Sequence, residues 1–325
     1  MRSILRLCAV AVLTVGVGSC SKSDTKPKVV IGFIGKSQAN AVFQAAHAGA
    51  RAAAKEAAAK YGVEVDLIIQ TPPSEDAQKQ AEAIDGLVRA NAAGIAISCS
   101  AANIVTPAIN RAVAAGAAVA CFDSDAPDSK RMCYYGTDDR DCGMRVMDEL
   151  AKAMGEKGTI AILAGNPSAP NLQARVAGVR EKLKSYPNMK ELNDGKGVFY
   201  HPETPSDAAE TVRTAQNTNP QIEGWAMIGG WPLFTKGALN WPPGRVKVVS
   251  VDALPAQLPY VKDGYVEVLL GQDCYGWGRR SVELLLDKIV LHKDPPAARI
   301  IDPLTPVTKQ NADEYGKRWE AWLGQ

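Results

Sequence analysis

Polar and aromatic side chains follow the β-branched runs of this sequence, at the points where parallel strands would end. Asn40 and Phe43 come after the first run, and Asp123 with Ser124 after the fourth. In open parallel sheets, ligands bind beyond the carboxyl ends of the strands. We therefore expect these side chains to contact a ligand, together with others that follow later runs: Trp231, Asp252 and Gln272.

The residue types suit a sugar. Aspartate, asparagine and glutamine can satisfy paired hydroxyl groups, while flat aromatic faces cover the apolar C–H side of a ring. Each residue also has a purely structural interpretation. Phe43 could be a core residue of a helix, Asp123 and Asp252 could be helix caps, and Trp231 could fill an interface between lobes. Their common position after strands favours ligand contact.

Enzymatic interpretations fit less well. Gly35-Lys36-Ser37 follows a strand as in a phosphate-binding loop, but Val30 stands where that motif requires its first glycine. No G-x-G-x-x-G opens a helix, which argues against a dinucleotide-binding dehydrogenase. No cysteine pair has zinc spacing, and the histidines are isolated: His47, His201 and His292. We expect no enzyme, no cofactor and no metal.

The elements that must position these residues alternate between strand and helix. Strand-like runs fall at 29–35, 63–70, 94–99, 117–123 and 133–136, and a second series falls at 159–165, 197–201, 224–229 and 246–251. The last third adds a strand at 265–271, a helix at 276–292, a short run at 299–303 and a helix at 312–323. This alternation is typical of βαβ units and predicts two doubly wound α/β lobes.

The N-terminus has the features of an export signal. Arg2 and Arg6 precede an uncharged stretch at 7–17 that is too short to span a membrane, and small residues lead into Cys20. Residues 17–20 resemble a bacterial lipobox. We expect a signal peptide at 1–19, a lipidated Cys20 with a tether at 20–28, and a protein held by its lipid in the periplasm or at the outer cell-envelope surface.

Charge and cysteine content restrict the class further. The 37 basic and 35 acidic residues give +2, and removing Arg2 and Arg6 leaves 35 against 35, so no basic field would attract nucleic acid. The chain of 325 residues, 46% of them hydrophobic, is long enough for two domains. Five cysteines beyond Cys20, without close pairs, argue against a disulfide framework. If one bridge forms, Cys133 with Cys142 is the expected pair.

The order of motifs over residues 29–310 resembles the type I periplasmic binding proteins, in particular their ribose and galactose-binding cluster. Residues 40–43 (Asn-Ala-Val-Phe) resemble the Asn-Pro-Phe-Phe ligand loop of that family. Residues 121–124 resemble the strand end that carries Asp-Arg there, with the aspartate kept and Ser124 in place of the arginine. Residues 137–139 resemble its Ser-Asp-Asn lobe crossing.

Further motifs follow the same order. Asn171 to Arg175 falls where the family has Ala-Ala-Arg-Glu-Arg, so Gln173 replaces a ligand arginine and Arg175 matches the next one. Asp252 resembles the aspartate of its Phe-Asp, and Gln272 its crossing glutamine. Trp231 stands where pentose and hexose binders have Asn-Asp, which leaves the identity of the sugar open and suits a ligand held more by stacking.

The resemblance implies a type I fold with three crossings forming a hinge. It places the N-terminal lobe at 29–137 plus 273–303 and the C-terminal lobe at 138–272 plus 304–325. The implied function is a monomeric substrate-binding protein of an ABC importer that closes on a monosaccharide and docks on permease subunits. Presentation of ligand to a receptor kinase or chemotaxis receptor, and a non-sugar ring ligand such as a nucleoside, remain alternatives. The implied ligand residues are Asn40, Phe43, Asp123, Ser124, Asn171, Gln173, Arg175, Trp231, Asp252 and Gln272.

Overall fold

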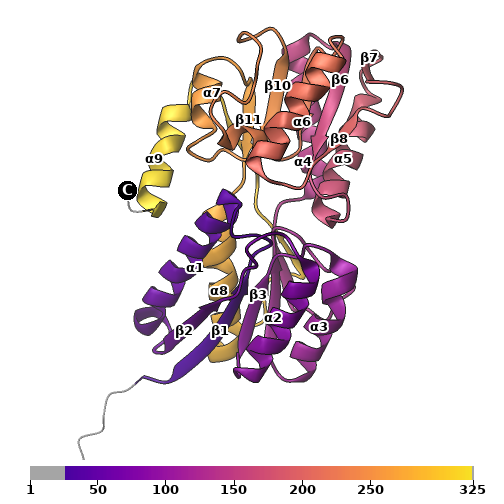
Figure 1. Cartoon of the computed structure of the whole chain (residues 1–325). Coiled ribbons are helices and arrows are strands. Elements are labelled where there is room, and N and C mark those ends of the chain that lie inside the picture. Colours follow the sequence, from indigo (N-terminus) through magenta and orange to yellow (C-terminus); the bar gives the residue numbers. More distant parts are fainter. Residues whose placement is uncertain (1–25, 324–325) are drawn as a thin grey trace, which may run out of the picture.

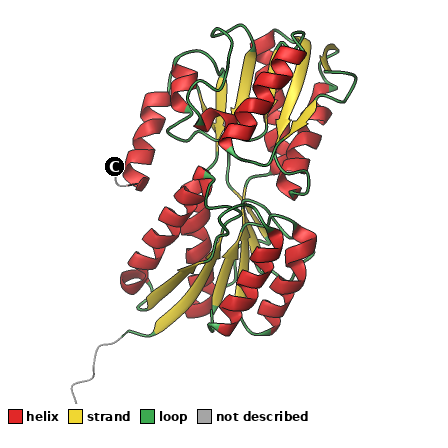
Figure 2. Ribbon diagram, viewed as in Figure 1, coloured by secondary structure: helices red, strands yellow, loops and turns green. Residues whose placement is uncertain are grey.

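The structure, a computed structural model, describes residues 26–323 and consists of two α/β lobes (Figure 1, Figure 2). The N-terminal lobe contains a sheet in the order β12-β5-β4-β3-β1-β2. Its strands are β1 (Lys28–Ile34), β2 (Glu64–Ile69), β3 (Gly94–Ile97), β4 (Ala118–Phe122), β5 (Cys133–Gly136) and β12 (Arg299–Ile301). Its helices are α1 (Ala41–Lys60), α2 (Ala77–Arg89), α3 (Ala102–Ala114) and α8 (Cys274–Leu291).

The C-terminal lobe contains a second sheet in the order β13-β11-β10-β9-β6-β7, with β8 also paired to β6. Its strands are β6 (Lys157–Ala164), β7 (Asn188–Glu191), β8 (Val198–Tyr200), β9 (Gly224–Met227), β10 (Lys247–Val251), β11 (Val268–Gly271) and β13 (Thr305–Val307). The helical segments are α4 (Asp139–Met154), α5 (Pro170–Leu183), α6 (Pro205–Thr218), η1 (Trp231–Phe234), α7 (Leu258–Lys262) and α9 (Ala312–Leu323).

The two sheets share one topology. The first five strands of the N-terminal lobe lie in the order β2-β1-β3-β4-β5, and β7-β6-β9-β10-β11 repeats that order in the other lobe. Every pair is parallel except β11 with β13. Helices cover both faces, which confirms the predicted doubly wound fold. β4 and β10 therefore occupy equivalent places, and so do the residues that follow them.

The chain passes between the lobes three times, after β5, after β11 and after β12. The crossings fall at 137–138, 272–273 and 302–304. Figure 1 shows the result, because the orange α8 lies in the lower lobe among indigo and purple elements from the first part of the chain. The two sheets therefore lie on opposite sides of one boundary between the lobes, and all three crossings run through this boundary.

Glycines allow helices to approach closely behind each sheet. Where α1 crosses α8, a Cβ on Gly278 would overlap the carbonyl oxygen of Ala46, and one on Gly49 would overlap the carbonyl oxygen of Tyr275. In the other lobe, a Cβ on Gly143 of α4 would overlap the carbonyl oxygen of Arg175. Backbone contact at these crossings fixes where α5 and α8 present their side chains.

The last helix contacts both lobes. Trp319 Nε1 of α9 donates to the carbonyl oxygen of Ala253 in the C-terminal lobe, at 2.8 Å. Trp322, one turn later, stacks on Tyr275 at the start of α8, with ring centroids 5.4 Å apart and planes 4° apart. Figure 1 shows α9 along the side of the upper lobe with its end directed at the lower one.

Several expectations need correction or lie outside the described residues. The expected bridge between Cys133 and Cys142 is wrong for this structure, because both are free and the crossing at 137–138 puts them in different lobes. The sequence did not predict β7, β13, η1 and α7, which are too short to show a periodic apolar pattern. The expected signal peptide and Cys20 precede residue 26. Among residues 26–323, no helix has the length and apolarity that crossing a membrane requires.

Candidate functional site

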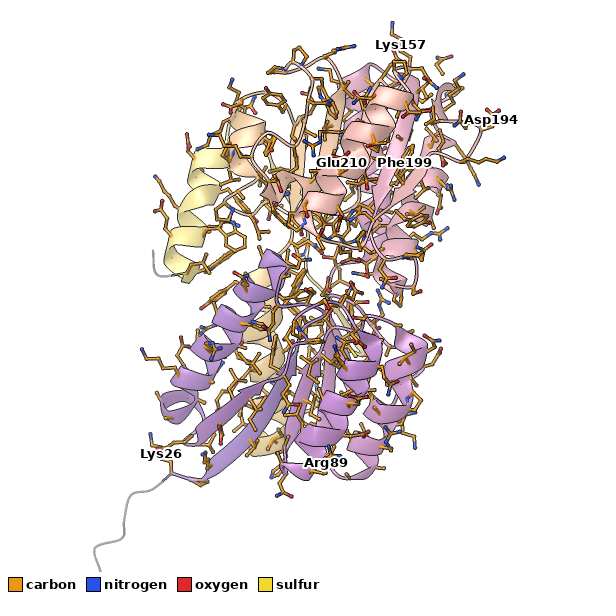
Figure 3. The ribbon with its side chains drawn as sticks, viewed as in Figure 1. Lys26, Arg89, Lys157, Asp194, Phe199 and Glu210 are labelled. Atoms are coloured by element: carbon orange, nitrogen blue, oxygen red, sulfur yellow. The ribbon has the colours of Figure 1, made fainter. Side chains whose placement is uncertain are left out.

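A cavity lies between the lobes, at the carboxyl ends of strands from both sheets. Most of the ligand residues expected from the sequence line it: Asn40, Phe43, Asp123, Asn171, Arg175, Trp231, Asp252 and Gln272. Its volume of about 30 Å³ is far below the roughly 300–1,000 Å³ of ordinary small-molecule sites. In Figure 3 the labelled Lys26 and Lys157 mark the outer ends of the two lobes, while other side chains crowd between the lobes.

Two aspartates face the cavity from opposite lobes. Asp123 follows β4 and Asp252 follows the equivalent strand β10, and both have left-handed backbone conformations, with φ 56° and 69°. Asp and Asn are the residues after glycine that adopt this conformation most readily. The same local geometry therefore turns a carboxylate from each lobe into the cavity.

The hydrogen bonds of these carboxylates come from neutral donors. Asp123 accepts from Ser98 Oγ at 2.6 Å and from Asn171 Nδ2 across the lobes at 3.4 Å. Asp252 accepts from Gln272 Nε2 at 2.8 Å and from the Gly230 amide at 3.2 Å. Within residues 26–323, no ion pair reaches either carboxylate. Burial raises the pKa of Asp252, so donors from a ligand would be favourable here.

Arg175 organises the back of the cavity. Its side chain is buried and donates to Asp139 Oδ1 at 2.9 Å, to the carbonyl oxygen of Ile228 at 3.0 Å and to Gln272 Oε1 at 2.8 Å. Gln272 Oε1 also accepts from Thr137 Oγ1 at 2.9 Å. Because Thr137 and Gln272 stand at two crossings, this network joins the cavity to the interlobe connections.

Burial and charge oppose each other in the Arg175–Asp139 pair. Desolvation lowers the pKa of Arg175, but the neighbouring acidic groups outweigh this effect, so the net pKa of Arg175 is raised. For Asp139, desolvation dominates over Arg175 and raises the pKa to about 6. The pair is thus tightly bonded while its carboxylate stays costly to ionise.

Aromatic side chains form two walls. Phe43 and Trp277 lie together in the N-terminal lobe, with ring centroids 6.4 Å apart. Trp231 begins η1 in the other lobe, and its ring meets His201 edge to face at 4.8 Å. These rings supply apolar faces beside the acids and amides described above.

Three polar or aromatic residues that line the cavity were not among the expected ligand residues: Lys36, Glu203 and Trp277. Lys36 is buried, and its Nζ donates to Asn171 Oδ1 across the lobes at 3.3 Å. Desolvation lowers its pKa, but Glu75, Glu203 and Asp123 outweigh that effect and the net pKa is raised. The position of Lys36 just after β1 could have identified it from the sequence. Glu203 and Trp277 have no comparable sequence signal, because a short loop brings Glu203 to the cavity and a helix from the end of the chain brings Trp277.

Two expected ligand residues do not reach the cavity. Asn171 and Arg175 are four residues apart and share one face of α5, whereas Gln173, two residues from each, points to another face. There it lines a surface hollow with Arg140 and Arg180. Ser124 is fully buried beside the β4 end, because the backbone turn at Asp123 directs only the aspartate inward.

Known proteins share both the sequence pattern and the fold. A family model described as a periplasmic binding protein domain matches residues 31–293. The D-ribose/D-allose-binding protein of Pseudomonas aeruginosa is 26% identical over 282 residues, which cover 80% of this chain and 83% of that protein.

Two solved structures extend the comparison. An ABC transporter solute-binding protein from Burkholderia graminis, in complex with D-arabinose, has a TM-score of 0.76 and 26% identity, with 87% of this chain and 96% of that chain covered. A carbohydrate transporter solute-binding protein from Agrobacterium radiobacter, also with D-arabinose, has a TM-score of 0.78 and 24% identity, with 90% and 98% covered. The second likeness concerns the fold alone.

Proposed function

Because the chain belongs to the periplasmic binding protein family, we propose that it binds a monosaccharide or a related sugar between its lobes and delivers it to an ABC importer. Membership confirms the resemblance inferred from the motifs. The observation that carries the sugar proposal is the meeting of Asp123 and Asp252 with aromatic walls in one interlobe cavity, where both carboxylates are buried and form no ion pair with any residue from 26 to 323. The names of the relatives at 26% identity, which bind ribose, allose and arabinose, support it.

Binding would follow a hinge movement about the three crossings. The cavity is too small for a sugar as it stands, and polar contacts already join the lobes across it, including Lys36 to Asn171 and Asn171 to Asp123. A ligand that contacts Asp123 and Asp252 at once would stabilise the closed arrangement of the lobes, because it can contact both lobes only in that arrangement.

The cellular setting is part of the same proposal. The N-terminal pattern that ends in Cys20 supports export and attachment by lipid, and the closed pair of lobes would present a surface to permease subunits. In this role the chain carries out no covalent step. The ATPase of the importer would supply the energy for transport.

Aspartate substitutions test the site directly. A thermal-shift panel of D-ribose, D-arabinose, D-allose, other hexoses, sugar alcohols and nucleosides identifies the ligand, because ligand that binds only the folded state raises the melting temperature. Calorimetry then compares Asp123→Asn and Asp252→Asn with the unchanged protein. A charge-assisted hydrogen bond contributes about 1.5–3 kcal/mol, so each variant is expected to bind roughly 10- to 150-fold more weakly.

Asparagine keeps the left-handed backbone, so the comparison isolates the carboxylate. The matched control is the exposed Asp128→Asn, which is expected to bind normally. Unchanged affinity in both cavity variants would contradict the site. A response to nucleosides alone would leave the fold in place but contradict the sugar proposal.

A further inference from the structure

A cluster of acids joins the lobes at the edge of the cavity. Glu75 lies between β2 and α2 in the N-terminal lobe, and Glu203 lies between β8 and α6 in the C-terminal lobe. Asn166, which follows β6, contacts both. Its backbone amide donates to Glu203 Oε1 at 2.9 Å and its Nδ2 donates to Glu75 Oε1 at 2.9 Å. One asparagine thus bonds a carboxyl group from each lobe, and the Glu203 carboxyl group lies within side-chain hydrogen-bonding reach of Glu75.

The positive charge that acts on these acids comes from Lys36 and is not directly paired with them. Within the described residues, no ion pair within 4.0 Å reaches Glu75 or Glu203. Lys36 faces them from the loop after β1 without an ion pair to either. His201, two residues before Glu203, accepts from the Glu203 amide through Nδ1 at 3.0 Å. Desolvation lowers the pKa of His201 to about 4, so it is neutral at physiological pH.

Two ionised carboxylates held this closely would repel each other. If one is protonated, it can donate to the other, and a hydrogen bond to a carboxylate is among the stronger ones in proteins. We propose that Glu75 and Glu203 share one proton when the lobes are together, and that this proton is a second ligand of the closed state, bound at the edge of the cavity. The proposal rests on the proposed function for the lobe movement.

The direction of the pH effect follows from the acid at the centre of the cluster. Burial, reinforced by Glu75 and opposed by Lys36, raises the pKa of Glu203 from 4.5 to about 7. In parted lobes Glu203 would regain water and its ordinary pKa. The closed state therefore binds the proton more tightly, so closure is favoured as the pH falls from about 7 towards 4.5 and disfavoured as it rises through 7. The change is at most about tenfold per pH unit.

The pH dependence of ligand affinity tests the proposal. Calorimetry from pH 5 to pH 8, with the sugar found by the panel, compares the unchanged protein with Glu203→Gln and Glu75→Gln. The unchanged protein is expected to lose about tenfold or more in affinity over this range, since the shared proton is released. Glu203→Gln removes the buried group that titrates and supplies a permanent N–H to Glu75, so this variant is expected to lose less than about threefold. Glu75→Gln leaves Glu203 buried and is expected to show a pH dependence between those of Glu203→Gln and the unchanged protein.

Asp139 and Asp252 also have raised pKa values and can add to the pH dependence. The test is therefore the difference in pH dependence between each variant and the unchanged protein. The exposed Glu82→Gln on α2 is the matched control and is expected to keep the full pH dependence. A slope in Glu203→Gln equal to that of the unchanged protein would overturn the proposal. Melting curves check that each variant folds.

A measurement without ligand separates this proposal from the proposed function. Small-angle X-ray scattering of the ligand-free protein is expected to show a radius of gyration that increases from pH 5 to pH 8, and no such increase in Glu203→Gln. Identical pH behaviour of the two proteins would overturn the shared proton even if a sugar binds. If no sugar in the panel binds, the proposed function fails, while the scattering result still decides on the proton.

Discussion

Replacing Arg175 by methionine is expected to lower the free energy of unfolding by about 3–5 kcal/mol at pH 7.5, because it strands a buried carboxylate. Arg175 is 3% exposed and is the only basic side chain that pairs with Asp139 among the described residues. Methionine keeps the length of the apolar stem but removes the donors that Arg175 directs to Asp139, Ile228 and Gln272. Urea unfolding of both proteins measures the difference.

The loss of unfolding free energy in Arg175→Met should be smaller at low pH than at high pH. Burial already raises the pKa of Asp139 from 3.8 to about 6, and the loss of Arg175 would raise it further. A raised pKa means that stability is lost as the pH rises through it, so the deficit of the variant should be smaller at pH 5 than at pH 7.5. The double variant Arg175→Met with Asp139→Asn is expected to recover part of the loss. An equal deficit at both pH values would contradict this account, and the exposed Arg89→Met is the control.

Alanine at Gly278 is expected to destabilise the N-terminal lobe by about 3 kcal/mol, because the new methyl group has no room where α8 crosses α1. It would overlap the carbonyl oxygen of Ala46 and lie 2.6 Å from the amide nitrogen of Ala50. Both obstacles are backbone atoms, so the helices themselves would have to move apart. The helix propensity gained by alanine, about 1 kcal/mol, offsets only part of this.

Gly86 provides the matched comparison. It also lies inside a helix, α2, but a Cβ there would meet only the Gln70 and Arg89 side chains, at 3.6 Å and 3.7 Å. Gly86→Ala is therefore expected to leave stability unchanged or to raise it by up to about 1 kcal/mol. Chemical denaturation of both variants gives the contrast. A Gly278→Ala protein as stable as the original would mean that the two helices cross at a greater separation.

Much of the fold was predictable because its elements are long and periodic. The alternation of β-branched runs with amphipathic segments predicted both sheets, and the last helix was expected at 312–323, where α9 lies. The segment from Trp231 to Lys262 was predicted only in part, because the strand at 246–251 was expected and the two helices on either side of it were not. Its helices η1 and α7 have four and five residues, too few to show a period. Strand β7 lacks the β-branched residues that usually identify a strand.

The site was predictable where a residue directly follows a strand, as Asp123 and Asp252 do. It was less predictable on helices, because a motif match does not fix which side chains of a helix face the cavity. Gln173 was expected there because it aligned with a ligand arginine of the family, but it lies on another face of α5. Trp277 depends on the return of α8 to the first lobe, and Glu203 on a three-dimensional approach to Glu75. Neither relation is present in any local pattern.

The left-handed backbone at Asp123 and Asp252 also limits how the protein can diverge. Glycine and asparagine are the substitutions that keep this conformation at low cost, and neither carries a charge. A change of ligand that required a basic or bulky side chain at either position would first have to rebuild the loop that follows β4 or β10. Variation in ligand preference is therefore expected to accumulate at neighbouring wall positions such as Trp231, while these two positions change only to glycine or asparagine unless the main chain changes with them.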